Sequence, residues 1–353
     1  MSADWFATLT GVPEASWPDT RAQLEISGTT LRSRANGRAF AIGTLETPSL
    51  ADLRARALTI APSTAGRLAV STLTADVTNL HRDRAHHGAV FQVASQFNLL
   101  EMTGPDITPE HGVTRYASDR TQGPACAIAA GAATIYRNYF VPVDGIPGQT
   151  RDRQIDCLRD VGTALRGGDA RGGAGDCPFS GPGQTSGAPW TMRNGYALCT
   201  AAQLTAINAR LAAMSANGRD ALRDCLRVGA HHDVQVTAPG AAPEQRVTQV
   251  FCSAMPVAYA PAPAALWAPF ASLVLEGAYE ATLWTAVLNA ARGTSNVVFL
   301  TQLGGGAFGN DPAWILAAMR RALGLVRERE LDVRVVSYSR PSEALLRLVA
   351  EFA

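Results

Sequence analysis

The C-terminal third of the chain carries the pattern that most limits its fold. Residues 297–301 (Val-Val-Phe-Leu-Thr) form a continuous apolar run, typical of a strand that is buried on both faces of a sheet. A glycine-rich stretch follows at 302–310, and Asp311-Pro312 then has the residue types of a helix N-cap and first turn. A further strand is predicted at 333–337. Strand, helix and strand in alternation predict a parallel α/β sheet.

Local signals predict the remaining elements. Asn36-Gly37 lies between two alternating segments, 22–32 and 38–45, and predicts an N-terminal β-hairpin. Ser49 is expected to cap a short helix. We predict strands at 68–74, 89–95, 231–237 and 246–252, and helices from Pro124, within 151–166, at 201–216 and 218–226, and along an apolar face from Trp267 to Leu288.

These elements predict a three-layer α/β/α domain over residues 61–353. The hairpin and short helix of residues 1–60 would pack on this domain as an extension. Residues 144–195 have the glycine-rich composition of an insertion or lid, with a disordered segment as the alternative. Residues 102–124 predict a long loop, and loops of that length in compact domains are usually functional or disordered.

The absence of lysine excludes several mechanisms. All 31 basic residues are arginine. No Schiff base can form on lysine, so pyridoxal-phosphate enzymes and Schiff-base aldolases are excluded. P-loop nucleotide triphosphatases and protein kinases are excluded as well, because both place a lysine on the nucleotide phosphates. A phosphate bound by this chain must be held by backbone N–H groups, a helix N-terminus or arginine.

Charge and cysteine usage narrow the partners. A net charge of +1 gives no electrostatic reason to expect nucleic acid or an anionic membrane as a partner. The first residues contain no apolar signal segment and no apolar run is long enough for a membrane helix, so we expect a cytoplasmic protein. The six cysteines include no C-x-x-C pair and the histidines lack zinc-site spacing, so we expect buried reduced thiols and neither metal nor cofactor.

The glycine-rich stretch after residues 297–301 suits an anion. Glycines let backbone N–H groups approach a phosphate closely, and the dipole of the following helix favours negative charge there. Gly304, Gly306 and Gly309 have G-x-G-x-x-G spacing, but the stretch follows a late strand and no acidic residue closes the next strand, so the motif is weak. A tight turn that needs glycine only for its conformation is the alternative.

Two short motifs resemble the macrodomain superfamily. Residues 298–301 with 304–310 (Gly-Gly-Gly-Ala-Phe-Gly-Asn) are similar to its second diphosphate loop, especially in the poly(ADP-ribose) glycohydrolase branch. Residues 93–98 (Val-Ala-Ser-Gln-Phe-Asn) are similar to a strand whose final Asn contacts the distal ribose. The resemblance implies ADP-ribose across the sheet crest, with Phe308 packed on the distal ribose. The implied ligand residues are Asn98, Gln122, Gly123, Thr301, Gly304, Gly305, Gly306, Ala307, Phe308, Gly309 and Asn310.

The chain departs from that branch where the catalytic carboxylates belong. A Gly-Gly-Gly run followed by Gln-Glu-Glu is missing after Asn98, and Leu99-Leu100-Glu101 stands there instead. Cleavage of an ADP-ribosyl bond needs a carboxylate near the anomeric carbon. The candidates are Glu101, Asp106, Glu110 and Asp119, each with a solvated or capping role as its alternative. We favour Glu101, which desolvation at an apolar strand end would make more basic, and Asp119.

Three functions follow from these observations. The first is a hydrolase of ADP-ribosylated protein. For this function, the chain resembles a divergent group that includes a bacterial effector acting on ADP-ribosyl-arginine in ubiquitin. If this chain is also an effector, it would be delivered into another cell. The second is a non-catalytic ADP-ribose reader. The third is a cysteine hydrolase at Cys126, with Gln122 nearby and His231 or His232 as base; against it, residues 125–130 have the composition of a buried helix.

Overall fold

A mixed seven-stranded sheet forms the centre of the protein. The computed structural model describes residues 4–61, 67–167 and 189–352. From one edge to the other the sheet consists of β4 (Thr44–Glu46), β11 (Gly229–Gln235), β12 (Arg246–Cys252), β6 (Val90–Ala94), β13 (Val297–Leu300), β14 (Asp332–Ser337) and β5 (Ala69–Thr74). The five strands from β12 to β5 are parallel, and β11 runs antiparallel to both of its neighbours. The predicted parallel sheet is therefore confirmed for its larger part.

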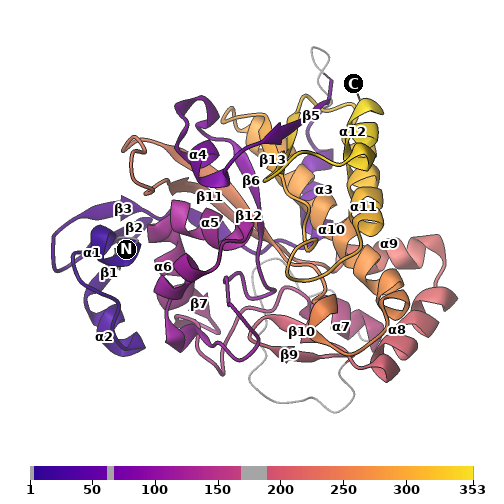
Figure 1. Ribbon diagram of the computed structural model, residues 1–353, viewed down its shortest axis with the longest axis horizontal. Helices are drawn as coiled ribbons and strands as arrows, with labels where there is room; N and C mark the ends of the chain where they lie inside the picture. The colour runs from indigo at the N-terminus through magenta and orange to yellow at the C-terminus, as the bar shows by residue number, and fades with distance from the viewer. Residues whose placement is uncertain (1–3, 62–66, 168–188, 353) are drawn as a thin grey trace.

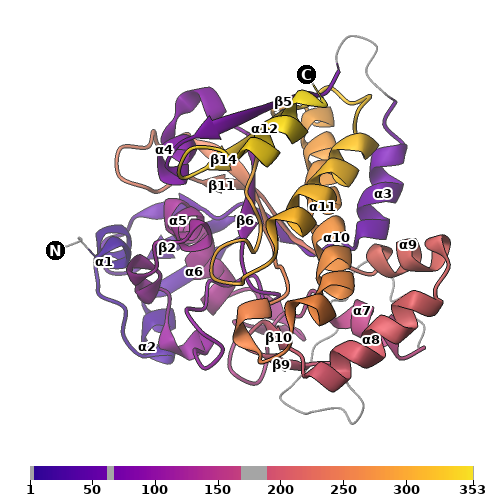
Figure 2. The ribbon, with the colours of Figure 1, turned by 45° about the vertical axis from the view of Figure 1, so that its right-hand side comes forward.

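Helices cover both faces of this sheet (Figures 1 and 2). The predicted three-layer α/β/α arrangement is confirmed, with α12 (Glu343–Ala350) beside α11 and β5. One face carries α4 (Val77–Arg82), α5 (Gln122–Ala129) and α6 (Gly131–Tyr139), and the other carries α3 (Leu50–Leu58), α10 (Ala264–Ala291) and α11 (Pro312–Leu325).

The C-terminal elements lie where the sequence predicts them. Asp311 accepts the N–H of Ala313 at 2.7 Å, and Pro312 occupies the first turn of α11. Ser49 caps α3 in the same way and forms a capping box with Asp52. Only one apolar face was predicted for α10, but more of its surface is buried. Helices α3, α11, α8 (Ala201–Ala213) and α9 (Ala216–Asp224) surround α10, so it is buried on nearly all sides.

The predicted N-terminal hairpin is present, but with shorter strands and additional elements before it. Helices α1 (Trp5–Thr10) and α2 (Trp17–Ala22) precede a three-stranded sheet of β1 (Leu24–Ser27), β2 (Thr30–Ser33) and β3 (Ala39–Ala41). The predicted strand at 22–32 is broken at Gly28, whose φ of 56° produces a turn.

The second predicted strand of the hairpin, 38–45, is also divided. Asn36-Gly37 lies in a longer loop between β2 and β3 instead of forming a two-residue turn. Gly43, at a φ of 69°, redirects the chain after β3, so that β4 leaves the extension and joins the central sheet. A Cβ at Gly43 would lie 1.9 Å from the carbonyl oxygen of His232, so only glycine fits this crossing.

Only part of the predicted insertion at 144–195 can be described, because 168–188 lie outside the described residues. A short hairpin of β9 (Thr191–Arg193) and β10 (Tyr196–Leu198) lies against the segment that follows β6. There the N–H of Phe97 donates to the carbonyl of Gly195 at 3.0 Å, and Asn194 donates to the carbonyl of Pro105 at 2.7 Å. The helix predicted within 151–166 is shorter, α7 (Arg159–Leu165), and β7 (Pro142–Val143) and β8 (Ile146–Pro147) precede it.

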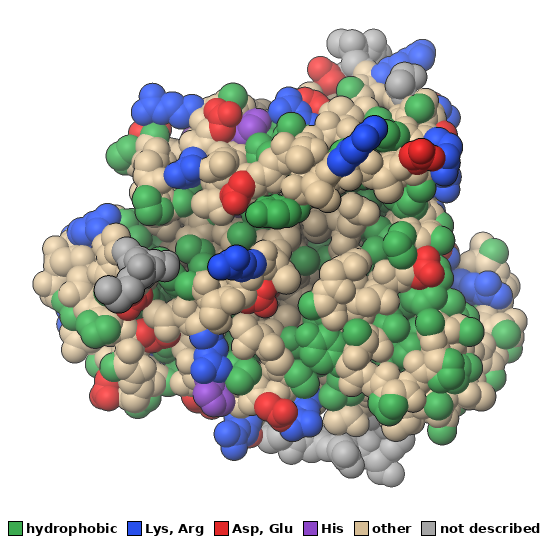
Figure 3. Space-filling model, viewed as in Figure 1, with side chains coloured by type: hydrophobic (Ala, Val, Ile, Leu, Met, Phe, Trp, Pro, Cys, Tyr) green, Lys and Arg blue, Asp and Glu red, His purple; other side chains and the backbone are tan. Residues whose placement is uncertain are grey.

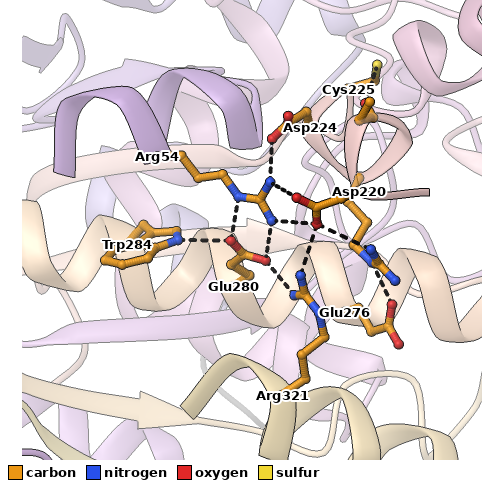
Figure 4. A network of polar contacts seen from close by, with 10 residues as sticks. Arg54, Asp220, Asp224, Cys225, Glu276, Glu280, Trp284 and Arg321 are labelled. Carbon is orange, nitrogen blue, oxygen red and sulfur yellow. Dashed lines mark hydrogen bonds and ion pairs between the residues drawn. The ribbon is translucent and has the colours of Figure 1, made fainter. Parts of the chain in front are cut away.

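An ion network joins α3, α9, α10 and α11 (Figure 4). Glu280 of α10 is 2% exposed, and both of its carboxylate oxygens accept from Arg54 of α3, at 2.6 and 2.8 Å. Arg321 and the indole N–H of Trp284 donate to the same carboxylate. Arg54 also reaches Asp220 of α9, so four helices share one cluster of charges.

The described residues contain neither a membrane-spanning helix nor a cluster of metal ligands. Within the described ranges, no helix combines the length and the hydropathy needed to cross a bilayer. Nor do three side chains among the described His, Cys, Asp and Glu residues converge as a metal site would require.

Candidate functional site

A cleft of about 450 Å³ opens at the carboxyl ends of the parallel strands. Residues that follow β5, β6, β13 and β14 line it, together with the start of α5, and the space-filling view is hollowed near the middle of this face (Figure 3). Ligands of parallel α/β sheets bind at this end of the strands.

The glycine-rich loop after β13 forms one wall of the cleft and has a fixed shape. Gly304 and Gly309 adopt φ values of 74° and 69°, which favour glycine. The side-chain amide of Asn310 donates to the carbonyls of Met255, at 2.8 Å, and Gly304, at 3.3 Å. Asn310 therefore holds the loop from behind.

Three successive N–H groups of this loop are available to a ligand. No acceptor within the described residues is assigned to the N–H groups of Gly306, Ala307 or Phe308, and all three residues line the cleft. Successive free N–H groups bind anions such as phosphate. The predicted contribution of the following helix dipole stays a prediction. At the N-terminus of α11 the Asp311 side chain accepts the N–H of Ala313, and Pro312 has no N–H to donate.

The start of α5 is bonded tightly to β6. The side chain of Gln122 accepts the N–H of Ala94 at 2.9 Å and donates to the carbonyl of Gln92 at 2.8 Å. Gln122 lines the cleft, but its amide is used in holding α5. Gly123 lies behind it, and a Cβ there would be 1.9 Å from the carbonyl oxygen of Ala94 and 2.3 Å from Glu101 Oε2. Gly123 therefore permits this close approach.

We expect Gly123→Ala to damage the site. The added methyl must push α5 away from β6, which should lower the free energy of unfolding by about 1–3 kcal/mol. Thermal unfolding measures the loss. Gly306→Ala is the matched control, because nothing lies within 4 Å of a Cβ at that glycine. Equal unfolding temperatures for the two variants would contradict the packing described here.

Glu101 presents a buried carboxyl to the cleft. The residue is 2% exposed, it lines the cleft, and Oε1 has no hydrogen-bond partner among the described residues. Burial raises the pKa of this carboxyl well above its usual value; Arg137 lowers the pKa and Asp119 raises it further. A raised pKa favours the protonated carboxyl, which is the form that a general acid needs.

A tight turn after β6 determines where Glu101 lies. Leu99 adopts a φ of 63°, and the N–H of Gln96 donates to the carbonyl of Leu100. The Gln96 side chain accepts the N–H of Met102 at 2.6 Å and donates to its carbonyl at 3.2 Å. Glu101 is therefore held between two fixed neighbours.

The other predicted carboxylates divide into one inside and two outside the cleft. Asp119 lines the cleft, is half-buried, and accepts the N–H of Thr121 at 2.8 Å. Asp106 pairs with Arg193 on the surface, and Glu110 accepts the N–H of Arg151 at 2.8 Å. Neither of these two lines the cleft.

The structure places Asn98 outside the cleft. Its side chain donates to Gln154 at 2.8 Å and accepts the N–H of Leu100 at 3.1 Å, so both polar atoms stabilise the turn. Of the predicted ligand residues, those that line the cleft are Gln122, Thr301, Gly304, Gly306, Ala307 and Phe308. Those that lie outside its lining are Asn98, Gly123, Gly305, Gly309 and Asn310.

Sequence reasoning selected Phe308 but missed the tyrosines of the cleft. Tyr196, Tyr259 and Phe308 form a cluster with ring centroids 5.1–5.6 Å apart. The Tyr196 hydroxyl donates to the carbonyl of Met102 at 2.7 Å, so the β9–β10 hairpin contributes to the wall near Glu101. Tyr338, 90% exposed, lies at the opposite end with Asp76. No motif contains the three tyrosines, so only the tertiary structure reveals them.

The geometry does not support a nucleophilic Cys126. Its side chain is fully buried and is not part of the cleft lining. Burial raises the pKa of the thiol well above its usual value, which disfavours the thiolate that nucleophilic attack requires. The predicted reduced state holds for Cys126, Cys199, Cys225 and Cys252, which are free thiols; Cys225 is half-buried and the others are buried.

Comparisons with known proteins give structural likenesses. The sequence matches no protein-family model and no curated protein. The fold is similar to that of poly(ADP-ribose) glycohydrolase from Thermomonospora curvata, with a TM-score of 0.40 and 15% identity over 94% of this chain and 93% of that one. It is also similar to poly(ADP-ribose) glycohydrolase from Deinococcus radiodurans in complex with ADP-ribose, with a TM-score of 0.40 and 10% identity over 87% and 93% of the chains. Likenesses of this size carry no information on activity, which has to come from the cleft itself.

Proposed function

We propose that the cleft binds ADP-ribose and that the chain hydrolyses the ADP-ribosyl linkage of a modified protein. The observation that carries the proposal is the buried carboxyl of Glu101, with an unpartnered oxygen, in the same cleft as three free N–H groups. A phosphate site beside a carboxyl of raised pKa suits a glycosidic bond attached to a phosphorylated sugar.

Binding would use the whole length of the cleft. The N–H groups of Gly306, Ala307 and Phe308 would hold the diphosphate, which is one of the means open to a chain without lysine. The Phe308 ring would pack on the distal ribose. The exposed ring of Tyr338 offers a surface on which adenine can stack, and Asp76 beside it can accept from an exocyclic amine.

Hydrolysis would use the two carboxyl groups that line the cleft. Glu101 would donate its proton to the acceptor atom as the bond from that atom to the anomeric carbon breaks. A water molecule would add its oxygen to the anomeric carbon and lose a proton, for which Asp119 is the base that we assign. Acid and base catalysis of this kind needs two carboxyls in different environments, which burial of Glu101 and partial exposure of Asp119 supply.

The acceptor that we propose is an arginine side chain, for which ubiquitin is one protein context. The basis is the resemblance of the two sequence motifs, together with leaving-group chemistry. The guanidine of the linkage already carries a proton and a positive charge at neutral pH. When its departing nitrogen takes the bonding electron pair and the proton of Glu101, arginine leaves as an intact guanidinium cation, so a single buried acid is sufficient for its departure.

Release of ADP-ribose from modified proteins tests this function. Substrates with guanidine-linked, ester-linked and serine-linked ADP-ribose should be incubated with the whole protein and the products separated by chromatography. We expect release of free ADP-ribose, fastest from the guanidine-linked substrate. Binding of the modified proteins without release from any of them would instead support the reader function, which the missing Gln-Glu-Glu signature favours as the second candidate.

A further inference from the structure

Arg137 is a fully buried arginine on α6, behind the turn that carries Glu101. Its guanidinium lies 3.8 Å from the ring centroid of Phe251. The Nε–H donates to the carbonyl of Leu99 at 3.1 Å, and the two terminal nitrogens reach Thr134 Oγ1 at 2.9 Å and His231 Nδ1 at 3.3 Å.

Every one of these partners is neutral. A guanidinium carries only N–H donors, so Nδ1 of His231 must accept and the imidazole is uncharged. Burial, together with the charge of Arg137, lowers the pKa of His231 well below its usual value. Among the described residues, no carboxylate lies within 4 Å of Arg137. Because an apolar residue would fill such a position at lower cost, structural packing alone does not account for this charge.

The charge of Arg137 acts on Glu101. Leu99, whose carbonyl Arg137 holds, is two residues before Glu101 in the same turn. The two groups interact electrostatically, and Arg137 opposes the effect of burial on the carboxyl. The other titratable groups that interact with Glu101 are Asp119 and Tyr116 of the long loop, Cys126 on α5 and Tyr196 on β10. All of these are acids that can supply no positive charge, which makes Arg137 the cation of this cluster.

We propose that Arg137 is a positioning residue for Glu101: it holds the Leu99 turn and places an unpaired positive charge behind the carboxyl. The inference rests on the proposed function of Glu101 as a general acid. When Glu101 gives its proton to the leaving acceptor, a carboxylate forms in a buried site. Arg137 stabilises that carboxylate as it forms, so the charge contributes at the step where the bond breaks.

The pH dependence of ADP-ribose release separates charge from geometry. Arg137→Met and Arg137→Gln remove the charge, whereas Arg137→Lys keeps it and loses the bond to Leu99. We expect the two neutral variants to release ADP-ribose at least about tenfold more slowly, with KM unchanged. In the pH–rate profile of these variants, the decline at alkaline pH should move to a higher pH by about one unit or more. The reason is that Glu101 must be protonated to act, and without the cation it loses its proton at a higher pH. In Arg137→Lys the alkaline decline of the pH–rate profile should stay within a few tenths of a pH unit of that of the wild type.

A direct titration makes the result independent of activity. The side-chain carboxyl of Glu101 can be followed by NMR on protein labelled with ¹³C-glutamate, with Glu101→Gln to assign the signal. We expect Glu101 to titrate at a higher pH in Arg137→Met, or in Arg137→Gln if only that variant folds, than in the wild type. Titration at the same pH in wild type and neutral variant would overturn the inference. If the wild type itself releases no ADP-ribose, the proposed function fails, and the titration still decides the role of Arg137.

Discussion

Replacing Glu101 with glutamine is expected to slow the release of ADP-ribose roughly a thousandfold while leaving the affinity for ADP-ribose nearly unchanged. Glutamine has the shape of the protonated carboxyl but no proton to donate. Oε1 has no partner in the described structure, so the substitution breaks no hydrogen bond at that atom. Single-turnover rates and calorimetric affinities measure the two quantities separately.

Two other carboxylates act as controls for Glu101. Asp119→Asn should reduce the rate as well, because Asp119 lines the same cleft. Glu110→Gln alters a carboxylate of the same long loop that lies outside the cleft and should be as active as the wild type. Full activity of Glu101→Gln, or a loss as large in Glu110→Gln, would contradict the assignment.

The raised pKa of Glu101 also predicts a stability effect. A carboxyl whose pKa is higher in the folded than in the unfolded chain contributes stability that is present below its unfolded pKa. That contribution is lost as the pH rises through its folded pKa. Glu101→Gln removes the group that must ionise in a buried site, so this variant should unfold less readily than the wild type at alkaline pH.

Removal of the Glu280 carboxylate should give the largest loss of stability. Glu280→Gln leaves Arg54 and Arg321 without their shared buried counter-charge, and loss of one partner of a buried ion pair costs about 3–5 kcal/mol. Urea unfolding measures this free energy. Glu351→Gln removes an exposed ion pair with Arg320 and should leave the free energy of unfolding nearly unchanged. Equal unfolding curves for both variants would show that the network contributes nothing to stability.

The same network predicts sensitivity to acid. Burial alone would raise the pKa of Glu280, but the hydrogen bonds from Arg54, Arg321 and Trp284 outweigh it and hold the pKa below its usual value. A depressed pKa contributes stability above the unfolded value, and this stability is lost as the pH falls through the folded pKa. The difference in stability between wild type and Glu280→Gln should therefore be full at neutral pH and shrink below about pH 4.

Local chemistry explains which parts of the fold were predictable. The C-terminal strand, loop and helix follow from an apolar run, glycine and the Asp311-Pro312 cap, all within a few residues of one another. The N-terminal hairpin is present, but its strands are shorter than predicted because Gly28 breaks the first strand, and because Gly43 redirects the chain where β4 passes the backbone of His232. That second breakpoint depends on a strand almost two hundred residues further along the chain.

In the cleft, too, residues with local sequence signals could be predicted and residues brought in from distant segments could not. The glycine loop and Glu101 could be selected from their immediate neighbours in sequence. Tyr196, Tyr338 and Arg137 could not, because they come from distant segments that only the sheet brings together. Asn98 was placed at the ligand by a motif, whereas in the structure Gln154 and the backbone of the turn bind its polar atoms.

Calorimetric titration with ADP-ribose tests the central claim most directly. The wild-type chain should bind one molecule with a dissociation constant below about 100 µM, because the free N–H groups at 306–308 suit the diphosphate and the aromatic walls of the cleft suit the adenosine and the distal ribose. The absence of measurable heat with ligand at about millimolar concentration would contradict both the hydrolase and the reader.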